Sequence, residues 1–243
     1  MGYSKASLPP GAVHAILVAT APDAAAQTAD LLWRPVLGRP LIAWPLSALL
    51  QLDALESCFI SFLPAHREDC RALVVDAPPG NGSLSGAYCR GERNWLSLLE
   101  MSGRIRDGWL VVVDATLPLV TTSALRAGLL AAERTGVAIA AEPVKETLKR
   151  VDGQVVVETL PREALRRLCP PVIFSRAAIW RVIEAYDPAG DVDANDLIAL
   201  IQRADVPLTV FDANYPCVRV TSEHDLSIVE SLLRRREMES SPL

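Results

Sequence analysis

The sequence has no excess of basic residues, which nucleic-acid-binding proteins usually show. Its 243 residues include 24 lysines or arginines and 29 aspartates or glutamates, so the net charge is −5 at pH 7. A broad nucleic-acid surface needs clustered cations to neutralise phosphates. We therefore expect no nucleic-acid partner, although this composition still allows a local basic pocket.

Long apolar runs and an ordered cysteine pattern are also missing. No stretch reaches the roughly 18–20 apolar residues of a membrane-spanning helix, and no signal peptide pattern opens the chain. The five cysteines are an odd number without CxxC spacing, and the three histidines lack metal-ligand spacing. These absences predict a cytoplasmic protein with no membrane contact, no disulfide framework and no histidine-based metal site.

Half of the residues are hydrophobic, and short apolar runs alternate with helix-like segments. The expected strands are 13–18, 57–62, 109–113, 137–141, 155–157, 171–174, 208–211 and 218–220. The expected helices begin at Gly38 and Ser222 and span 66–73, 93–101, 121–135, 162–168, 176–186 and 193–203, the last capped by Asp193. This alternation predicts an α/β fold with a doubly wound, mostly parallel sheet, in which ligands bind beyond the carboxyl ends of the strands. We expect a single domain over residues 1–243, with a loose tail at 1–11.

Several segments carry residues that suit a ligand, each with a structural alternative. Asp114 follows a buried strand, which suits a magnesium or ribose contact, but it could also cap the next turn. The basic segment 143–150, supported by Thr147, could hold a phosphate or could be a charged edge strand. Residues 80–86 lack the ending of a P-loop and favour a surface loop, and residues 191–195 favour a helix cap over a calcium loop.

A set of motifs in chain order resembles one known family. The segments are Gly38-Arg-Pro-Leu-Ile42, Arg93, Trp109–Pro118, Ala140–Val151, Glu158–Arg162, Leu168–Pro171 and Val218–Leu226. Together they resemble the 2-C-methyl-D-erythritol 4-phosphate cytidylyltransferase family over about residues 13–233. Each motif is weak alone, and their common order gives the resemblance its specificity.

The resemblance implies a Rossmann-like nucleotidyltransferase fold, with a projecting β-arm at about residues 143–158 that forms a homodimer. It also implies that CTP and a polyol phosphate are joined, with release of pyrophosphate, in the non-mevalonate isoprenoid pathway. Mg²⁺ is the implied cofactor.

The resemblance also assigns roles to individual residues. It makes Asp114 a metal-binding and nucleotide-binding residue, and Arg93 a second nucleotide-binding residue. It makes Thr147, Arg162 and Arg219 the residues that bind the substrate phosphate. The resemblance assigns no catalytic residue.

The sequence departs from the family pattern on the CTP side. Residues 19–26 contain neither Gly-x-Gly nor an arginine, and Leu31 stands at the position of the family lysine. Val113 and Leu117 replace a histidine and an arginine of the family signature. Because one preorganised donor is typically worth about 10²–10³ in rate, these losses predict impaired catalysis.

Three hypotheses follow. The chain is a divergent cytidylyltransferase in which Arg34 or Lys149 replaces the missing cations, or a catalytically inactive pseudoenzyme with a binding or regulatory role. The third is a related transferase that uses another nucleotide, which the missing glycine-rich loop disfavours equally.

Overall fold

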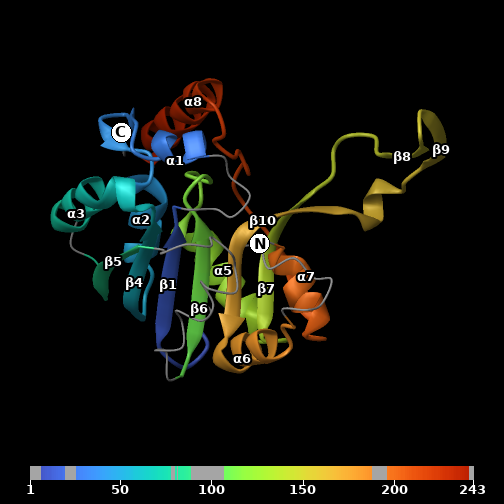
Figure 1. The fold of residues 1–243 in the computed structure, drawn as a ribbon, viewed down its shortest axis with the longest axis horizontal. Helices are drawn as coiled ribbons and strands as arrows, with labels where there is room; N and C mark the ends of the chain where they lie inside the picture. Colours follow the sequence, from blue (N-terminus) through green and yellow to red (C-terminus); the bar gives the residue numbers. More distant parts are fainter. Residues whose placement is uncertain are drawn as a thin grey trace.

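The computed structural model describes residues 7–19, 26–77, 80, 82–88, 107–187 and 196–240 (Figure 1). The strands are β1 (Val13–Val18), β2 (Pro35–Val36), β3 (Arg39–Pro40), β4 (Leu55–Phe62), β5 (Ser83–Tyr88), β6 (Trp109–Asp114), β7 (Val137–Pro143), β8 (Lys149–Asp152), β9 (Val155–Thr159), β10 (Arg166–Ser175) and β11 (Leu208–Asp212). The α-helices are α1 (Ala26–Leu31), α2 (Ala43–Leu50), α3 (Arg67–Asp76), α5 (Thr122–Ala132), α6 (Arg176–Glu184), α7 (Leu197–Arg203) and α8 (Glu223–Ser240). Two short 3-10 turns are η1 (Pro64–His66) and η3 (Arg162–Ala164).

Seven strands form the central sheet in the order β11-β7-β10-β6-β1-β4-β5. All neighbouring pairs are parallel except those of β10, which runs antiparallel to both β6 and β7. The predicted doubly wound, mostly parallel sheet is therefore confirmed. β4 and β5 lie on one side of β1, and β6 lies on the other, so the chain order reverses between β1 and β6. Such a switch point opens a crevice for ligands beyond the carboxyl ends of the strands.

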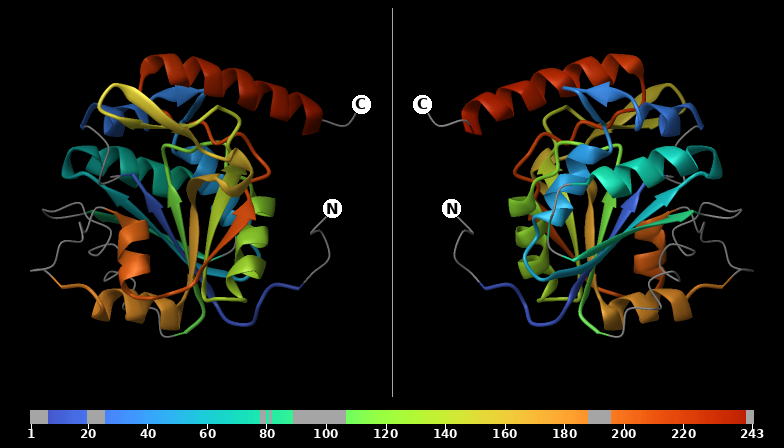
Figure 2. Two further views of the ribbon diagram at one scale, coloured as in Figure 1. Left: turned by 90° about the vertical axis from the view of Figure 1, so that its right-hand side faces the viewer. Right: turned by 90° about the vertical axis from the view of Figure 1, so that its left-hand side faces the viewer.

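Helices cover both faces of this sheet (Figure 2). Ala15 and Leu17 of β1 belong to the core formed with α2, α3, α5 and α8. Ile16 and Val18 of the same strand pack with residues of α6 and α7 on the opposite face. Because successive side chains of a strand point to opposite faces, a strand buried on both faces reads as a continuous apolar run.

An arm projects from the sheet between β7 and β10 (Figure 1). It contains the antiparallel hairpin of β8 and β9. Val151, Val155, Val156 and Val157 of this hairpin are 54–66% exposed. A separate finding concerns membranes: among the helices of the described ranges, none is long and apolar enough to cross one.

The region around Gly38 corrects one prediction. Gly38 does not begin a helix but, with Leu37, forms the turn between β2 and β3, and both residues have positive φ angles. Helix α2 begins at Ala43 instead. Pro45 is tolerated because it lies in the first turn of α2, where a backbone N–H has no partner within the helix.

Residues 83–86, predicted as part of a loop, form the first part of the edge strand β5. They pair in parallel with Ser57–Ile60 of β4. An edge strand gains its hydrogen bonds through the backbone, so its small polar side chains concealed it in the sequence.

Three boundaries in the second half also differ from the predictions. The helix expected at 162–168 is only the short turn η3, because Arg166 already begins β10. Residues 218–220, predicted as a strand, lie outside the strands of the described structure. Asp196 caps α7, with its Oδ1 accepting from the backbone N–H of Ala199 at 2.9 Å. The predicted cap Asp193 and the predicted helix 93–101 lie outside the described residues.

Candidate functional site

Asp114, the last residue of β6, forms a polar cluster at the carboxyl edge of the sheet. The residue is buried, with only 1% of its surface exposed. Its Oδ1 accepts hydrogen bonds from the backbone N–H of Thr116 at 2.8 Å and from the Thr116 hydroxyl at 2.6 Å. Its Oδ2 accepts from Nη1 of Arg219, which also donates to Thr116 Oγ1 at 3.1 Å. The structure thus brings Asp114, which the resemblance assigns to the metal and the nucleotide, into contact with Arg219, which it assigns to the substrate phosphate.

Backbone contacts hold this cluster in place. The backbone N–H of Leu117 donates to the Asp114 carbonyl at 3.1 Å, which forms a tight turn after β6. The backbone N–H of Val220 donates to the Thr116 carbonyl at 2.8 Å, which fixes the chain next to Arg219. The ion pair therefore links the end of β6 to the segment that leads into α8.

The two charges of the pair have different environments. The Asp114 side chain is 2% exposed, whereas the Arg219 side chain is 37% exposed. The described contacts of Arg219 use only Nη1, and a guanidinium carries five N–H donors. The remaining donors suit a phosphate oxygen, because arginine binds phosphates through charge-assisted hydrogen bonds.

The predicted nucleotide side of the site includes Leu31, at the position of the family lysine, and the nearby Arg34. Neither supplies an unpaired positive charge in the described structure. Leu31 ends α1 and is 9% exposed, so it belongs to the core. Arg34 pairs with Glu223 across a distance of 3.3 Å from Nη1 to Oε1. Arg93 and residues 20–25 lie outside the described residues.

His66, which the sequence analysis left without a role, connects α1 to the start of α3. Its Nε2 lies 3.1 Å from Oδ1 of Asp30, and its Nδ1 lies 3.3 Å from Oδ2 of Asp69. Its ring stacks on Trp33 with 5.3 Å between ring centroids. Because two carboxylates already face His66, this residue does not supply the missing positive charge. Only the fold brings Asp30 and His66 together.

Thr147 and Arg162 both lie in the chain that forms the arm. Thr147 is exposed, and Nη1 of Arg162 donates to the Lys145 carbonyl at 3.1 Å. Lys149, one of the cations proposed as a replacement, donates to Thr159 Oγ1 at 2.5 Å across the hairpin. The three predicted phosphate-binding residues are thus divided between the arm and the sheet edge.

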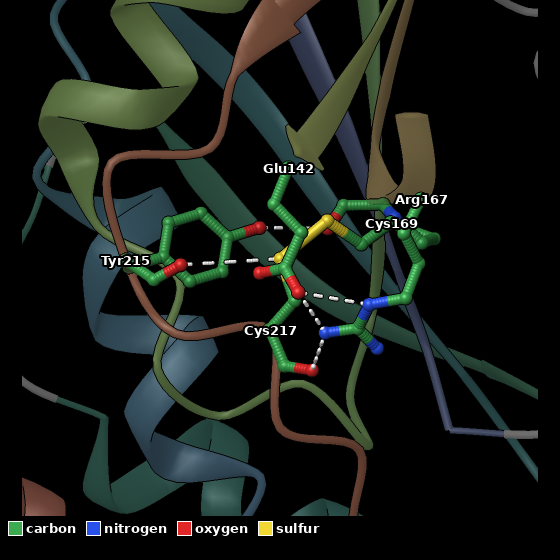
Figure 3. The surroundings of a disulfide bond; sticks show 6 residues. Glu142, Arg167, Cys169, Tyr215 and Cys217 are labelled. Atoms are coloured by element: carbon green, nitrogen blue, oxygen red, sulfur yellow. Dashed lines mark hydrogen bonds and ion pairs between the residues drawn. A yellow bond between two sulfur atoms is a disulfide. The ribbon is translucent and has the colours of Figure 1, made fainter. Parts of the chain in front are cut away.

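A disulfide joins Cys169 of β10 to Cys217 (Figure 3). Their Cα atoms lie 6.5 Å apart, and 48 positions separate the two residues in the sequence. The expectation that the cysteines form no disulfide was therefore wrong. Spacing could not reveal this bond, because only the packing of β10 against the segment before α8 brings the two cysteines together.

Residues 13–235 match the family model described as IspD: 2-C-methyl-D-erythritol 4-phosphate cytidylyltransferase. The chain belongs to this family. Family members are nucleotidyltransferases, generally metal-dependent, with CTP and 2-C-methyl-D-erythritol 4-phosphate as substrates.

Curated relatives carry the same family name. The enzyme of Dehalococcoides mccartyi (strain CBDB1) is 29% identical over 226 residues, which cover 92% of this chain and 96% of the relative. The enzyme of Bacillus cytotoxicus is 32% identical over 196 residues, which cover 80% of this chain and 85% of the relative.

Solved structures share the fold. The 4-diphosphocytidyl-2C-methyl-D-erythritol synthase of Anaerococcus prevotii superposes with a TM-score of 0.78 at 18% identity, covering 92% of this chain and 99% of the other. The 2-C-methyl-D-erythritol 4-phosphate cytidylyltransferase of Thermus thermophilus superposes with a TM-score of 0.64 at 24% identity, covering 90% and 98%. At these identities the likeness shows the fold alone.

The described residues do not fit a metal ion bound to Asp114. Both oxygens of this carboxylate already accept hydrogen bonds, and a divalent cation at Oδ2 would meet the like charge of Arg219. Within the described ranges, no group of three or more His, Cys, Asp or Glu side chains could hold a metal. The guanidinium of Arg219 thus occupies the position next to the carboxylate where a cation would bind.

Proposed function

We propose that this protein transfers the cytidylyl group of CTP to 2-C-methyl-D-erythritol 4-phosphate. The contact between Asp114 and Arg219 carries the proposal, because it places a half-buried cation at the switch point of the sheet. Membership of the family over residues 13–235 gives the substrates. A buried carboxylate that orients a partly exposed guanidinium suits an anionic sugar phosphate.

The reaction needs orientation and positive charge more than it needs a base. An oxygen of the substrate phosphate, already an anion, forms a bond to the α-phosphorus of CTP. The bond from this phosphorus to the bridging oxygen of the β-phosphate breaks, and pyrophosphate leaves with the electron pair. In this proposal Arg219 binds and orients the attacking phosphate, and Asp114 holds Arg219 in place.

Nucleotide binding remains a prediction for Arg93 and for the chain after β1. Mg²⁺ remains the predicted cofactor. We propose that it would bind together with CTP, because phosphate oxygens are ligands that Mg²⁺ prefers. In this proposal Asp114 acts through Arg219, which it orients toward the substrate phosphate.

We further propose that the chain forms a homodimer through its arm. The hairpin exposes four valines, with Val151 and Val156 on one face and Val155 and Val157 on the other, and a second copy would cover the apolar side chains of one of these faces. Because Thr147 and Arg162 lie on the projecting arm, they would reach a substrate phosphate in the site of the partner.

A pseudoenzyme is the second candidate, and one observation favours it. Leu31 is buried in the core at the position of the family lysine, and the nearby Arg34 pairs with Glu223. A chain without these cations would keep the fold and the phosphate site but would bind the triphosphate of CTP weakly.

Titration calorimetry with CTP and Mg²⁺ separates the two candidates. The transferase predicts saturable binding that Arg93→Ala weakens at least tenfold. The matched control is Arg126→Ala, because Arg126 pairs with Asp53 in the turn between α2 and β4, outside the proposed site. No binding of CTP up to millimolar concentration would leave the pseudoenzyme as the supported function.

A further inference from the structure

The segment between β11 and α8, residues 213–222, carries Arg219 without belonging to a helix or strand. Backbone bonds hold it at its two ends. The backbone N–H of Ala213 donates to the Ala141 carbonyl at 3.1 Å, and that of Val220 donates to the Thr116 carbonyl at 2.8 Å. Arg219 lies between the bond of Val220 and the middle of the segment, so its backbone is held from both sides.

The middle of the segment is held by β10 (Figure 3). Cys217 is bonded to Cys169 through the disulfide. The Tyr215 hydroxyl donates to the Pro170 carbonyl at 2.8 Å. Nη2 of Arg167 donates to the Cys217 carbonyl at 3.0 Å. These three anchors of residues 214–218 thus converge on a short stretch of β10, at Arg167, Cys169 and Pro170.

These anchors differ in strength. The hydrogen bond of Arg167 lies at the surface, since its side chain is 55% exposed and also pairs with Glu142. The Tyr215 hydroxyl stays protonated, because burial and then the charge of Glu142 raise the pKa of this residue. The disulfide is the covalent anchor, and both of its cysteines are 4% exposed.

The disulfide lies close to the proposed phosphate site along the chain. Arg219 is two positions after Cys217, and an extended chain advances about 3.3–3.6 Å per residue, so their Cα atoms lie within about 7 Å. A displacement of Cys217 is therefore passed to Arg219, which must reach a carboxylate that is itself fixed at the end of β6.

We propose that the Cys169–Cys217 disulfide is a positioning element that holds Arg219 against Asp114 and so controls binding of the substrate phosphate. The proposal rests on the proposed function for the identity of that phosphate. Reduction by a dithiol transfers two electrons to the disulfide, and each sulfur takes a proton. The dithiol becomes a disulfide, and residues 214–218 keep only their hydrogen bonds to β10.

The other described cysteines provide a control. Cys58 and Cys70 are free and buried. Burial raises the pKa of the Cys58 thiol to about 12, and burial with the nearby Asp69 raises that of Cys70 to about 11. Both thiols are protonated and unreactive near neutral pH. Cys58→Ala therefore removes a buried sulfur without removing the covalent anchor.

The test compares the double variant Cys169→Ala/Cys217→Ala with Cys58→Ala. Hydrogen exchange of the backbone amides of residues 214–220, other than Pro216, is measured first, together with inorganic phosphate binding by calorimetry. We expect faster exchange in these amides and weaker phosphate binding in the double variant only. Exchange equal to that of the wild type would overturn the proposal, whether or not the protein is a transferase.

Turnover then tests the link to the reaction. The KM for the polyol phosphate should rise roughly 10- to 100-fold in the double variant, since misplacing a group by about 1 Å can cost about 10²-fold. The KM for CTP should stay within about twofold. A dithiol should raise the KM of the wild type and of Cys58→Ala, oxidation should restore it, and the double variant should not respond. Equal responses of all three proteins would contradict a role of this disulfide.

If the wild type shows no turnover, the proposed function fails. The exchange and phosphate measurements still decide whether the disulfide positions Arg219.

Discussion

Replacing Arg219 with alanine should destabilise the fold, because it leaves the Asp114 carboxylate buried without its cation. Asp114 is 1% exposed and would keep only the two hydrogen bonds from Thr116. The reverse change, Asp114→Asn, leaves Arg219 without its partner, but the 37% exposed guanidinium can be hydrated. The two substitutions should therefore have unequal costs.

The expected loss of folding stability lies between the values for a fully buried and a fully exposed ion pair. Breaking a fully buried ion pair costs about 3–5 kcal/mol, whereas an exposed pair is worth about 0–1 kcal/mol. Since one partner is buried and the other is partly hydrated, we expect about 2 kcal/mol for Arg219→Ala and about 1 kcal/mol for Asp114→Asn. For a chain of this size, about 2 kcal/mol lowers the Tm by about 4–8 °C.

Urea denaturation followed by circular dichroism measures these costs. The matched control is Arg34→Ala, whose ion pair with Glu223 is 59% and 62% exposed and should contribute less than about 0.5 kcal/mol. The double variant Asp114→Asn/Arg219→Ala should cost less than the sum of the single changes. Additive costs, or a larger cost for Asp114→Asn than for Arg219→Ala, would refute the reasoning.

The remaining predictions concern other parts of the fold. Burial lowers the pKa of His14, whose Nδ1 lies 2.8 Å from Ser57 Oγ. The unfolded chain therefore binds a proton that the native state disfavours, and stability should fall as the pH drops below about 6.5, with a smaller slope in His14→Gln. Gly128→Ala should cost about 1–3 kcal/mol in urea denaturation, because a Cβ there would lie 2.7 Å from the ring of Phe211. Val155→Asp/Val157→Asp should shift sedimentation from dimer to monomer while the far-UV circular dichroism stays that of the folded chain, and an unchanged sedimentation coefficient would exclude the arm as the interface.

The sequence predicted the central sheet because its strands are buried on both faces. The segments Val13–Val18 and Trp109–Asp114 are mostly apolar and too short for a typical helix, and both form buried strands of the sheet. The edge strand β5 was harder to predict, since it relies on backbone pairing and its sequence carries small side chains, whereas the other edge strand, β11, was predicted at 208–211. The turn at Gly38 resembled a helix start because proline suits both a first helical turn and a short strand.

The candidate site was predictable residue by residue but not as an arrangement. Asp114 follows a buried strand and Arg219 lies in a motif shared with the family, so both could be named from the sequence. Their contact spans 105 positions, and the disulfide spans 48. Nothing local in the chain encodes such pairings, which arise only when the segment before α8 packs against β6 and β10.

The most direct measurement of the proposed function is ³¹P NMR of the protein mixed with CTP, Mg²⁺ and 2-C-methyl-D-erythritol 4-phosphate. The proposal predicts that the signals of CTP are replaced by those of pyrophosphate and of a new cytidine diphosphate ester. This conversion should be slowed at least tenfold by Arg219→Ala and left unchanged by Arg126→Ala. Unchanged CTP after prolonged incubation with the oxidised wild-type protein would contradict the proposed transfer and would favour the pseudoenzyme.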